Sequence, residues 1–119
     1  MWNAPTEKQL AKIPPLYSTE GQPIAEKKVL MHFFLNSCDW YVTEYNPGDR
    51  LFFGFAILNG DLMNAEWGCV SLDELLSLKS GMNVNGKIFP DCIEVDRDLH
   101  WNVRKASEVE KIVEANGIF

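Results

Sequence analysis

The sequence predicts an α+β fold, in which an antiparallel β-meander of about five strands forms a single domain with short flanking helices. Runs rich in aromatic and β-branched residues are separated by clusters of turn residues, as in strands joined by hairpins. Sequences typical of helix N-termini occur near both ends of this region. With 119 residues, of which 46% are hydrophobic and 24% charged, the chain has the size and composition of one globular domain spanning residues 1–119.

The first half of the chain predicts one short helix and three strands. Thr6 and Gln9 stand in the positions of a capping box, so a helix is expected over residues 6–13, where Pro14-Pro15 ends it. Residues 16–26 contain Gly21 and Pro23 and are expected to form a loop. The three expected strands cover residues 29–35, 40–45 and 51–58.

The second half predicts two more strands and two helices. Asn59-Gly60 is a strong signal for a two-residue hairpin turn, which would lead into a fourth strand over residues 61–70. A capping box at Ser71 and Glu74 begins a helix that runs to about residue 79. The remaining expected elements are a loop over 80–90, a fifth strand over 92–101, and a helix that begins at the Ser107–Glu110 capping box and ends at Asn116-Gly117.

Composition constrains the partners and the compartment. Seventeen acidic and eleven basic residues give a net charge of −6, which argues against binding nucleic acid over a broad surface. The cysteines, Cys38, Cys69 and Cys92, are widely spaced and are expected to be buried free thiols in a cytoplasmic protein. The longest apolar run, residues 51–58, is too short to span a membrane, which needs about 20 residues.

Motifs for cofactors and metals are weak. Gly81 to Lys87 matches most of a phosphate-binding loop, but Ile88 replaces the required Ser or Thr and the flanking elements do not fit. Glu94, Asp96, Asp98 and His100 alternate along the expected fifth strand, but ligands about 6.6 Å apart cannot share one Mg²⁺ shell of about 2.1 Å radius. We expect neither a cofactor nor a bound metal.

Charged residues on otherwise apolar strand faces are the sharper signal. Glu44 is expected to share a face with Trp40 and Val42, and pairing through Asn59-Gly60 would place Glu66 opposite Phe53 on that same face. Arg97 also lies on the apolar side of its strand. The two carboxylates and the guanidinium are therefore expected to meet, either as a buried ion-pair network or as an acid/base or ligand-binding site.

The same residues carry a resemblance to a known family. Trp40-Tyr-Val-Thr-Glu44, Phe53-Gly-Phe55, Glu66-Trp-Gly68 and Arg97-Asp-Leu-His-Trp101 occur in that order. The chain thereby resembles, over nearly its whole length, the bacterial family known as domain of unknown function 2958. It departs from the pattern in a longer segment at 57–64 and an inserted loop at 80–91.

The resemblance implies a protein encoded on plasmids, integrative elements or phages, often near genes for DNA processing or anti-restriction, and it supplies no activity. It also places Glu44, Glu66, Arg97, Asp98 and Trp101 on the family motif, which makes them the candidate functional cluster.

Two classes of function remain. In the first, the chain is a non-enzymatic acidic accessory protein that binds a protein partner, without direct contact to nucleic acid or membrane. In the second, it is a small enzyme or ligand-binding domain whose site is centred on Glu44, Glu66 and Arg97. Self-association without a ligand is a third possibility that the sequence leaves open.

Overall fold

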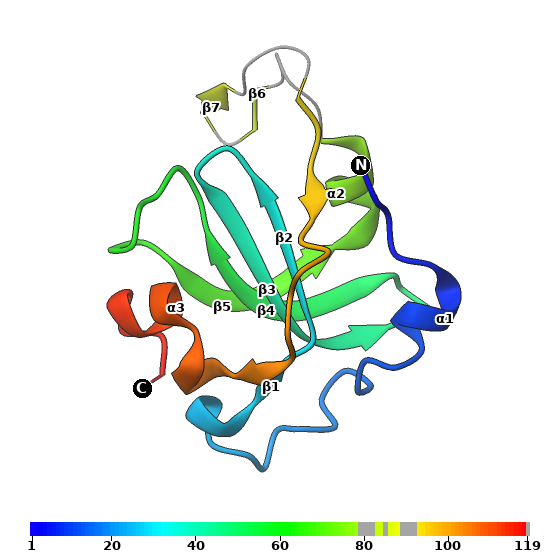
Figure 1. The fold of residues 1–119 in the computed structure, drawn as a ribbon, viewed down its shortest axis with the longest axis vertical. Coiled ribbons are helices and arrows are strands. Elements are labelled where there is room, and N and C mark those ends of the chain that lie inside the picture. The colour runs from blue at the N-terminus through cyan, green and yellow to red at the C-terminus, as the bar shows by residue number, and fades with distance from the viewer. Residues whose placement is uncertain (79–82, 85, 89–92, 119) are drawn as a thin grey trace.

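Five antiparallel strands form the central sheet of the protein, in the order β5-β4-β3-β2-β8 (Figure 1). The structure is a computed structural model and describes residues 1–78, 83–84, 86–88 and 93–118. β2 to β5 are a meander, and β8 adds to the free side of β2, so the α+β class is confirmed. The strands are β2 (Met31–Leu35), β3 (Cys38–Asn46), β4 (Leu51–Ile57), β5 (Glu66–Ser71) and β8 (Asp96–Arg97).

Smaller elements surround this sheet. β1 (Lys28–Val29) pairs with β9 (Arg104–Lys105), and β6 (Asn83–Val84) pairs with β7 (Lys87–Ile88). The helical segments are α1 (Glu7–Leu10), η1 (Ile24–Glu26), α2 (Leu72–Ser77), η2 (Ala106–Glu108) and α3 (Glu110–Glu114).

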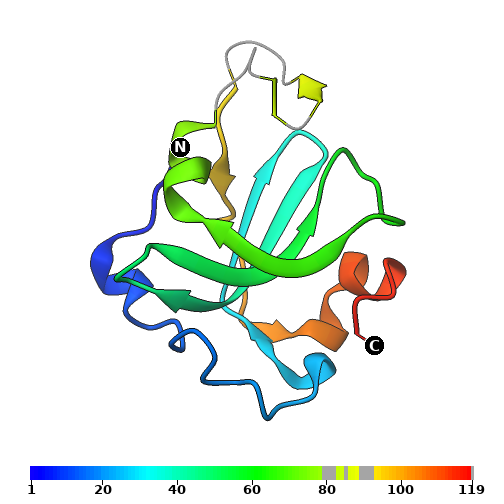
Figure 2. The same cartoon turned by 180° about the vertical axis from the view of Figure 1, so that it is seen from behind.

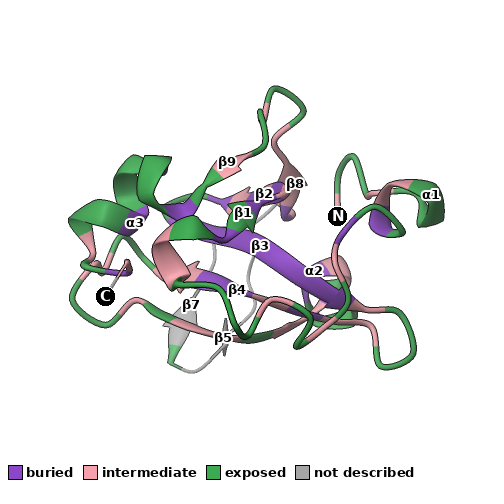
Figure 3. Ribbon diagram, turned by 90° about the horizontal axis from the view of Figure 1, so that it is seen from below, coloured by how far each residue is buried: buried purple, intermediate pink, exposed green. Residues whose placement is uncertain are grey.

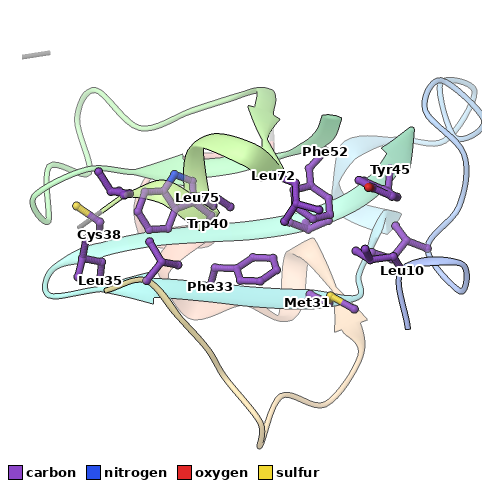
Figure 4. Close-up of a cluster of buried hydrophobic side chains, with 14 residues drawn as sticks. Leu10, Met31, Phe33, Leu35, Cys38, Trp40, Tyr45, Phe52, Leu72 and Leu75 are labelled. Atoms are coloured by element: carbon purple, nitrogen blue, oxygen red, sulfur yellow. The ribbon is translucent and has the colours of Figure 1, made fainter. Parts of the chain in front are cut away.

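Both faces of the sheet are covered, and β3 is buried along nearly its whole length (Figure 3). On one side, which we call the α2 face, Phe33, Trp40 and Phe52 pack against Leu72 and other side chains of α1 and α2 (Figure 4). On the other side, the α3 face, the buried residues are Val29, Tyr41, Phe55, Ile57, Ala106, Val109 and Ile112. The sheet is therefore the middle layer, covered on one face by α1 and α2 and on the other by segments that include η2 and α3.

An irregularity in β3 determines which face its last residues occupy. Val42 pairs with Gly54 and Glu44 pairs with Phe53, so Thr43 is an additional residue that has no partner in β4. Such a bulge reverses the alternation of side chains beyond it. Glu44 consequently shares the α3 face with Phe53, as predicted, but not the face of Trp40 and Val42, where the sequence placed it.

The pairing of β4 with β5 differs from the predicted hairpin. Glu66 pairs with Ala56, and Phe53 pairs with Cys69, so the register is offset by three residues from the expected one. The reason lies at Asn59 and Gly60: Gly60 donates its N–H to the carbonyl of Ser37, and β5 begins only at Glu66. A longer connection therefore replaces the two-residue turn, and Glu66 moves to the α2 side of the sheet.

Local helix signals were better guides than strand pairing. Thr6 and Gln9 form the predicted capping box, and the Ser71 hydroxyl accepts a hydrogen bond from the N–H of Glu74. The predicted box at Ser107 and Glu110 was wrong: Glu108 accepts the N–H of Lys105, which caps η2 two residues before the predicted cap.

Three further sequence predictions have outcomes here. Cys38 is buried as expected, whereas Cys69 is exposed on the edge strand β5 and contradicts that expectation. Cys92, like parts of the phosphate-loop match at 81–87, lies outside the described residues. Within the described ranges, no helix has the length and apolar character needed to cross a membrane.

Gly54 is expected to be indispensable to the bulge. A Cβ atom at this position would lie 2.2 Å from the carbonyl oxygen of Tyr41. Because this oxygen belongs to the backbone, a side-chain rotation cannot relieve the clash. Gly54→Ala should therefore lower the free energy of unfolding by about 1–3 kcal/mol in urea titrations. Its pairing partner Gly68 is the matched control: a Cβ there meets nothing within 4 Å, so Gly68→Ala should change stability by about 0.5 kcal/mol at most. Equal losses for both variants would contradict the steric account.

Candidate functional site

The predicted cluster of Glu44, Glu66 and Arg97 does not assemble. Glu66 lies on β5 and Arg97 on β8, which are the two outer strands of the sheet. Four inter-strand steps of about 4.8 Å separate them by roughly 19 Å. The bulge at Thr43 turns Glu44 onto the α3 face, whereas Arg97 pairs with Phe33, a residue of the α2 face. The expectation of a site centred on these three residues is therefore wrong.

Glu44 instead anchors the segment that precedes η1. Its side chain is 3% exposed, and one carboxylate oxygen accepts the N–H of Tyr17 at 2.8 Å. The other oxygen accepts both the N–H and the hydroxyl of Thr19. Tyr17 has a positive φ of 68°, which belongs to the turn that directs these donors at Glu44.

Lys27 completes this anchor. Its ammonium lies 3.5 Å from the Glu44 carboxylate and donates to the carbonyl and hydroxyl oxygens of Thr19, each at 2.6 Å. Burial opposes the charged form of Glu44, but the hydrogen bonds from Thr19 and Tyr17 and the charge of Lys27 outweigh it, so the pKa of Glu44 is held below its ordinary value. A pocket of about 250 Å³ lies beside the pair, lined by Tyr17 and Phe53 among others. Both carboxylate oxygens of Glu44 already accept hydrogen bonds from Tyr17 and Thr19. We therefore interpret Glu44 as a structural residue in the wall of this pocket.

A second charged cluster lies on the α3 face around His32. One ring nitrogen of His32 is 2.7 Å from a carboxylate oxygen of Asp39, and the other is 3.2 Å from Asp98. Lys111 of α3 donates to the second oxygen of Asp39 at 2.9 Å. Burial would raise the pKa of Asp39, but His32 and Lys111 more than compensate and lower it.

Aromatic rings enclose this His32 cluster. His32 stacks on Tyr41 with ring centroids 4.5 Å apart, and the ring of Trp101 lies 5.4 Å from it. Trp101 donates its ring N–H to the carbonyl of Val29. The guanidinium carbon of Arg104 lies over the Trp101 ring, 4.1 Å from its centroid. Burial, reinforced by the charge of Asp39, raises the pKa of Tyr41.

The His32 cluster unites two of the predicted residues with one the sequence analysis missed. Asp98 and Trp101 both contact His32, which comes from a different strand. An imidazole carries an N–H on both nitrogens only when it is charged, so both contacts are full hydrogen bonds only in protonated His32. The sequence carried only a weak signal: His32 alternates with the buried Met31 and Phe33 along its strand, which does not identify its partners.

The remaining candidate residues have separate local roles. Glu66 is exposed and lines a shallow pocket of about 270 Å³ with Ala56 and Asn64. Arg97 donates to the carbonyl of Asn3 at 2.9 Å, near the molecular surface. This hydrogen bond is exposed to solvent. Arg97 therefore has an exposed contact, which stabilises the fold little, in place of the expected buried ion-pair network.

The acidic row before His100 binds neighbouring segments of the chain. Glu94 lies 2.5 Å from the amino group of Met1, Asp96 accepts from the Asn3 amide, and Asp98 accepts the N–H of His100. In the part of the chain that the structure describes, no three His, Cys, Asp or Glu residues are arranged to hold a metal ion.

Two basic pairs of the sequence, Lys27-Lys28 and Arg104-Lys105, lie side by side. Lys28 and Lys105 are opposite each other in the β1–β9 ladder, and Arg104 is opposite Val29. Lys105 forms a 2.9 Å ion pair with Glu26, and Lys27 points inward to Glu44. The two basic pairs that were separate in sequence thus meet, although part of their charge is already neutralised.

Comparison with protein-family models, with curated proteins and with solved structures finds no match for this chain. The functional argument therefore depends on the residues and their geometry.

Replacing Glu44 by Gln should destabilise the protein in a pH-dependent way. Because the pKa of Glu44 is lowered in the folded state, its contribution is complete above the ordinary value of about 4.5 and is lost as the pH falls through the folded value. Glu44→Gln should cost about 3 kcal/mol at neutral pH, and the difference from the native protein should shrink below about pH 4.5. Urea unfolding across this pH range measures it. The control is Glu20→Gln, a substitution at an exposed residue of the same pocket, which should change neither the stability at neutral pH nor its dependence on pH. A loss of stability for Glu44→Gln that does not vary with pH would contradict the structural role of the ionised Glu44.

Replacing His32 by Phe should show how far the His32 cluster holds the α3 face together. Phe retains the stack on Tyr41 but removes both ring nitrogens, so the buried Asp39 and the half-buried Asp98 lose a partner. We expect a loss of about 1–3 kcal/mol in urea unfolding. Lys111→Met is the control: its side chain is 53% exposed, and its pair with Asp39 should contribute under about 1 kcal/mol. A larger loss for Lys111→Met than for His32→Phe would contradict the central place of His32.

Proposed function

We propose that this protein acts in the bacterial cytoplasm by binding the basic surface of a protein partner, as an accessory protein of a plasmid, integrative element or phage. The observation that carries the proposal is the distribution of exposed charge. Among the described residues, exposed acidic side chains outnumber exposed basic ones by ten to five. The acidic ones are Glu7, Glu20, Glu26, Asp49, Glu66, Asp73, Glu74, Glu108, Glu110 and Glu114, and the basic ones are Lys8, Lys12, Lys28, Lys105 and Lys111.

Internal pairing makes this imbalance larger. Lys105 is bound by Glu26 and Lys111 by Asp39, so two of the five exposed ammonium groups are already paired. Among the described residues, only two of the ten exposed carboxylates form an ion pair: Glu26 with Lys105 and Asp73 with Arg50. Unpaired surface carboxylates attract a basic surface over a Debye length of about 10 Å and accelerate encounter with it.

The chemistry of the partner follows from this charge. A surface that binds nucleic acid is lined by Lys and Arg, and an acidic protein can occupy it in place of phosphates. The resemblance described above, with its setting among DNA-processing and anti-restriction genes, supports a partner of this kind. The chain itself should bind such a partner and not the nucleic acid.

Salt-dependent capture tests the proposal. The immobilised protein is exposed to a bacterial lysate at about 50 mM and about 500 mM salt, and a captured protein is identified, purified and titrated by calorimetry. We expect a protein with a basic, nucleic-acid-binding surface, whose affinity falls at least about tenfold at high salt.

Two controls make the outcome decisive. Glu110→Lys and Glu114→Lys together reverse exposed charge on α3 and should weaken capture if acidity drives it. Labelled duplex DNA is titrated in parallel and should not bind at sub-micromolar concentration. DNA binding that Lys28→Glu abolishes would contradict the proposal, as would capture of a partner that neither salt nor charge reversal affects.

A further inference from the structure

One edge of the central sheet is unpaired. β5 pairs with β4 on one side, and it is the last strand of the sheet among the described residues. Figure 2 shows β5 running in front of the other strands and directly into α2. The opposite edge differs, because β8 has only two residues and Trp2 bridges to it at Asp96.

The hydrogen-bonding pattern shows which groups of β5 face outward. Leu72 donates its N–H to the carbonyl of Arg50 at 3.0 Å, so this pair is hydrogen-bonded across the ladder. In an antiparallel ladder such pairs recur every second residue. The register then assigns the inward bonds to the pairs Phe52–Val70, Gly54–Gly68 and Ala56–Glu66. The N–H and C=O groups of Trp67 and Cys69, which alternate with these, point away from β4.

As far as the structure describes the chain, this edge lacks the devices that usually prevent strand addition. Natural edges are short, carry an inward-pointing charge or a proline, or are covered by another element. β5 has six residues and no proline, and its charged residue, Glu66, stands at its first position. Gly68 has nothing within 4 Å of a Cβ placed on it, and Cys69 is exposed.

An apolar surface adjoins the outward groups. Trp67 stacks on Phe53 with ring centroids 5.7 Å apart, and both side chains are only half-buried. They lie on the α3 face with Cys69, because Phe53 pairs with Cys69 and Phe55 with Trp67. A strand added to β5 would lay alternate side chains along this surface.

The charges at the ends of β5 select the occupant. Glu66 is exposed at its beginning, and Asp73 and Glu74 are exposed at its end, in the first turn of α2. Arg50, which binds Asp73, is the base in contact with this group. Acidic ends on an apolar strand complement an extended segment with Lys or Arg around β-branched or apolar residues.

We propose that β5 accepts an extended basic segment of the protein partner as an additional strand of the sheet. The inference rests on the proposed function and names the surface that performs it. A second copy of the chain is a poorer occupant, because each copy has a net charge of −6 and would bring the same acidic ends to the shared edge.

Backbone exchange with a designed probe tests the inference. The probe is a synthetic peptide of about eight residues that alternates Lys with Val, and its counterpart replaces each Lys by Glu. In the free protein the amide protons of Trp67 and Cys69 should exchange rapidly, whereas those of Gly68 and Val70 are protected. Saturation with the basic peptide should slow exchange of the Trp67 and Cys69 amides at least about tenfold, and the acidic peptide should not.

A proline variant separates strand addition from simple attraction of charge. Cys69→Pro removes an outward N–H that the protein does not use internally, so the fold should persist, as checked by circular dichroism. Binding of the basic peptide should fall at least about tenfold, whereas the matched variant Cys69→Ala should bind as the native chain does. If Cys69→Pro unfolds, the exchange rates in the native chain decide alone.

Two results would overturn the inference. One is protection of Trp67 and Cys69 in the free protein at concentrations where it sediments as a dimer, since a second copy would then occupy the edge. The other is undiminished binding of the basic peptide by folded Cys69→Pro. If that variant also captures the cellular partner with unchanged salt dependence, the assignment of β5 as the binding edge is wrong, whereas the proposal of an acidic binding surface stands. Failure of the native chain to capture any basic partner would instead remove the proposed function.

Discussion

The additional residue at Thr43 is the constraint on which the arrangement of charge in this protein depends. It allows β3 to continue in register with β4 while its side chains change faces, so Tyr45 joins the apolar α2 face and Glu44 turns to the α3 face. Gly54 makes the change possible, because the backbone of Tyr41 comes too close for any side chain there. A regular strand would bury the Glu44 carboxylate among Trp40 and Val42, in an apolar environment that opposes its charge.

The consequences extend to the segments outside the sheet. A buried charge is tolerated only when its hydrogen bonds are complete, and on the α3 face the partners come from distant parts of the chain. Glu44 holds the segment around Thr19 and Lys27, while Asp39 and His32 hold Asp98 and α3 through Lys111. The buried core of the α2 face consists of apolar side chains. Buried charges on the α3 face thus help to hold the segments that cover it.

The sequence predicted features that depend on neighbours along the chain. The caps at Thr6 and Ser71 and the succession of strands over residues 31–71 follow from local chemistry, and both are present. The pairing of β8 with β2 depends instead on contacts between segments far apart in the chain. The bulge and the register of β5 depend on contacts across strands, such as that between Gly60 and Ser37, which no local pattern specifies. A shift of three residues moved Glu66 to the other face and separated it from Glu44. His32 was missed because its partners, Asp39 and Asp98, meet it only in the folded sheet.

The proposed function depends on two sets of groups: exposed carboxylates without counter-ions, and the outward backbone groups of Trp67 and Cys69. A crystal structure of the protein bound to its cellular partner tests this claim most directly. The account predicts a partner segment hydrogen-bonded to the N–H and C=O groups of Trp67 and Cys69, with basic side chains near Glu66 and Glu74. A complex in which the β5 edge remains in solvent, with the partner seated on the pocket between α1 and Tyr45, would contradict it.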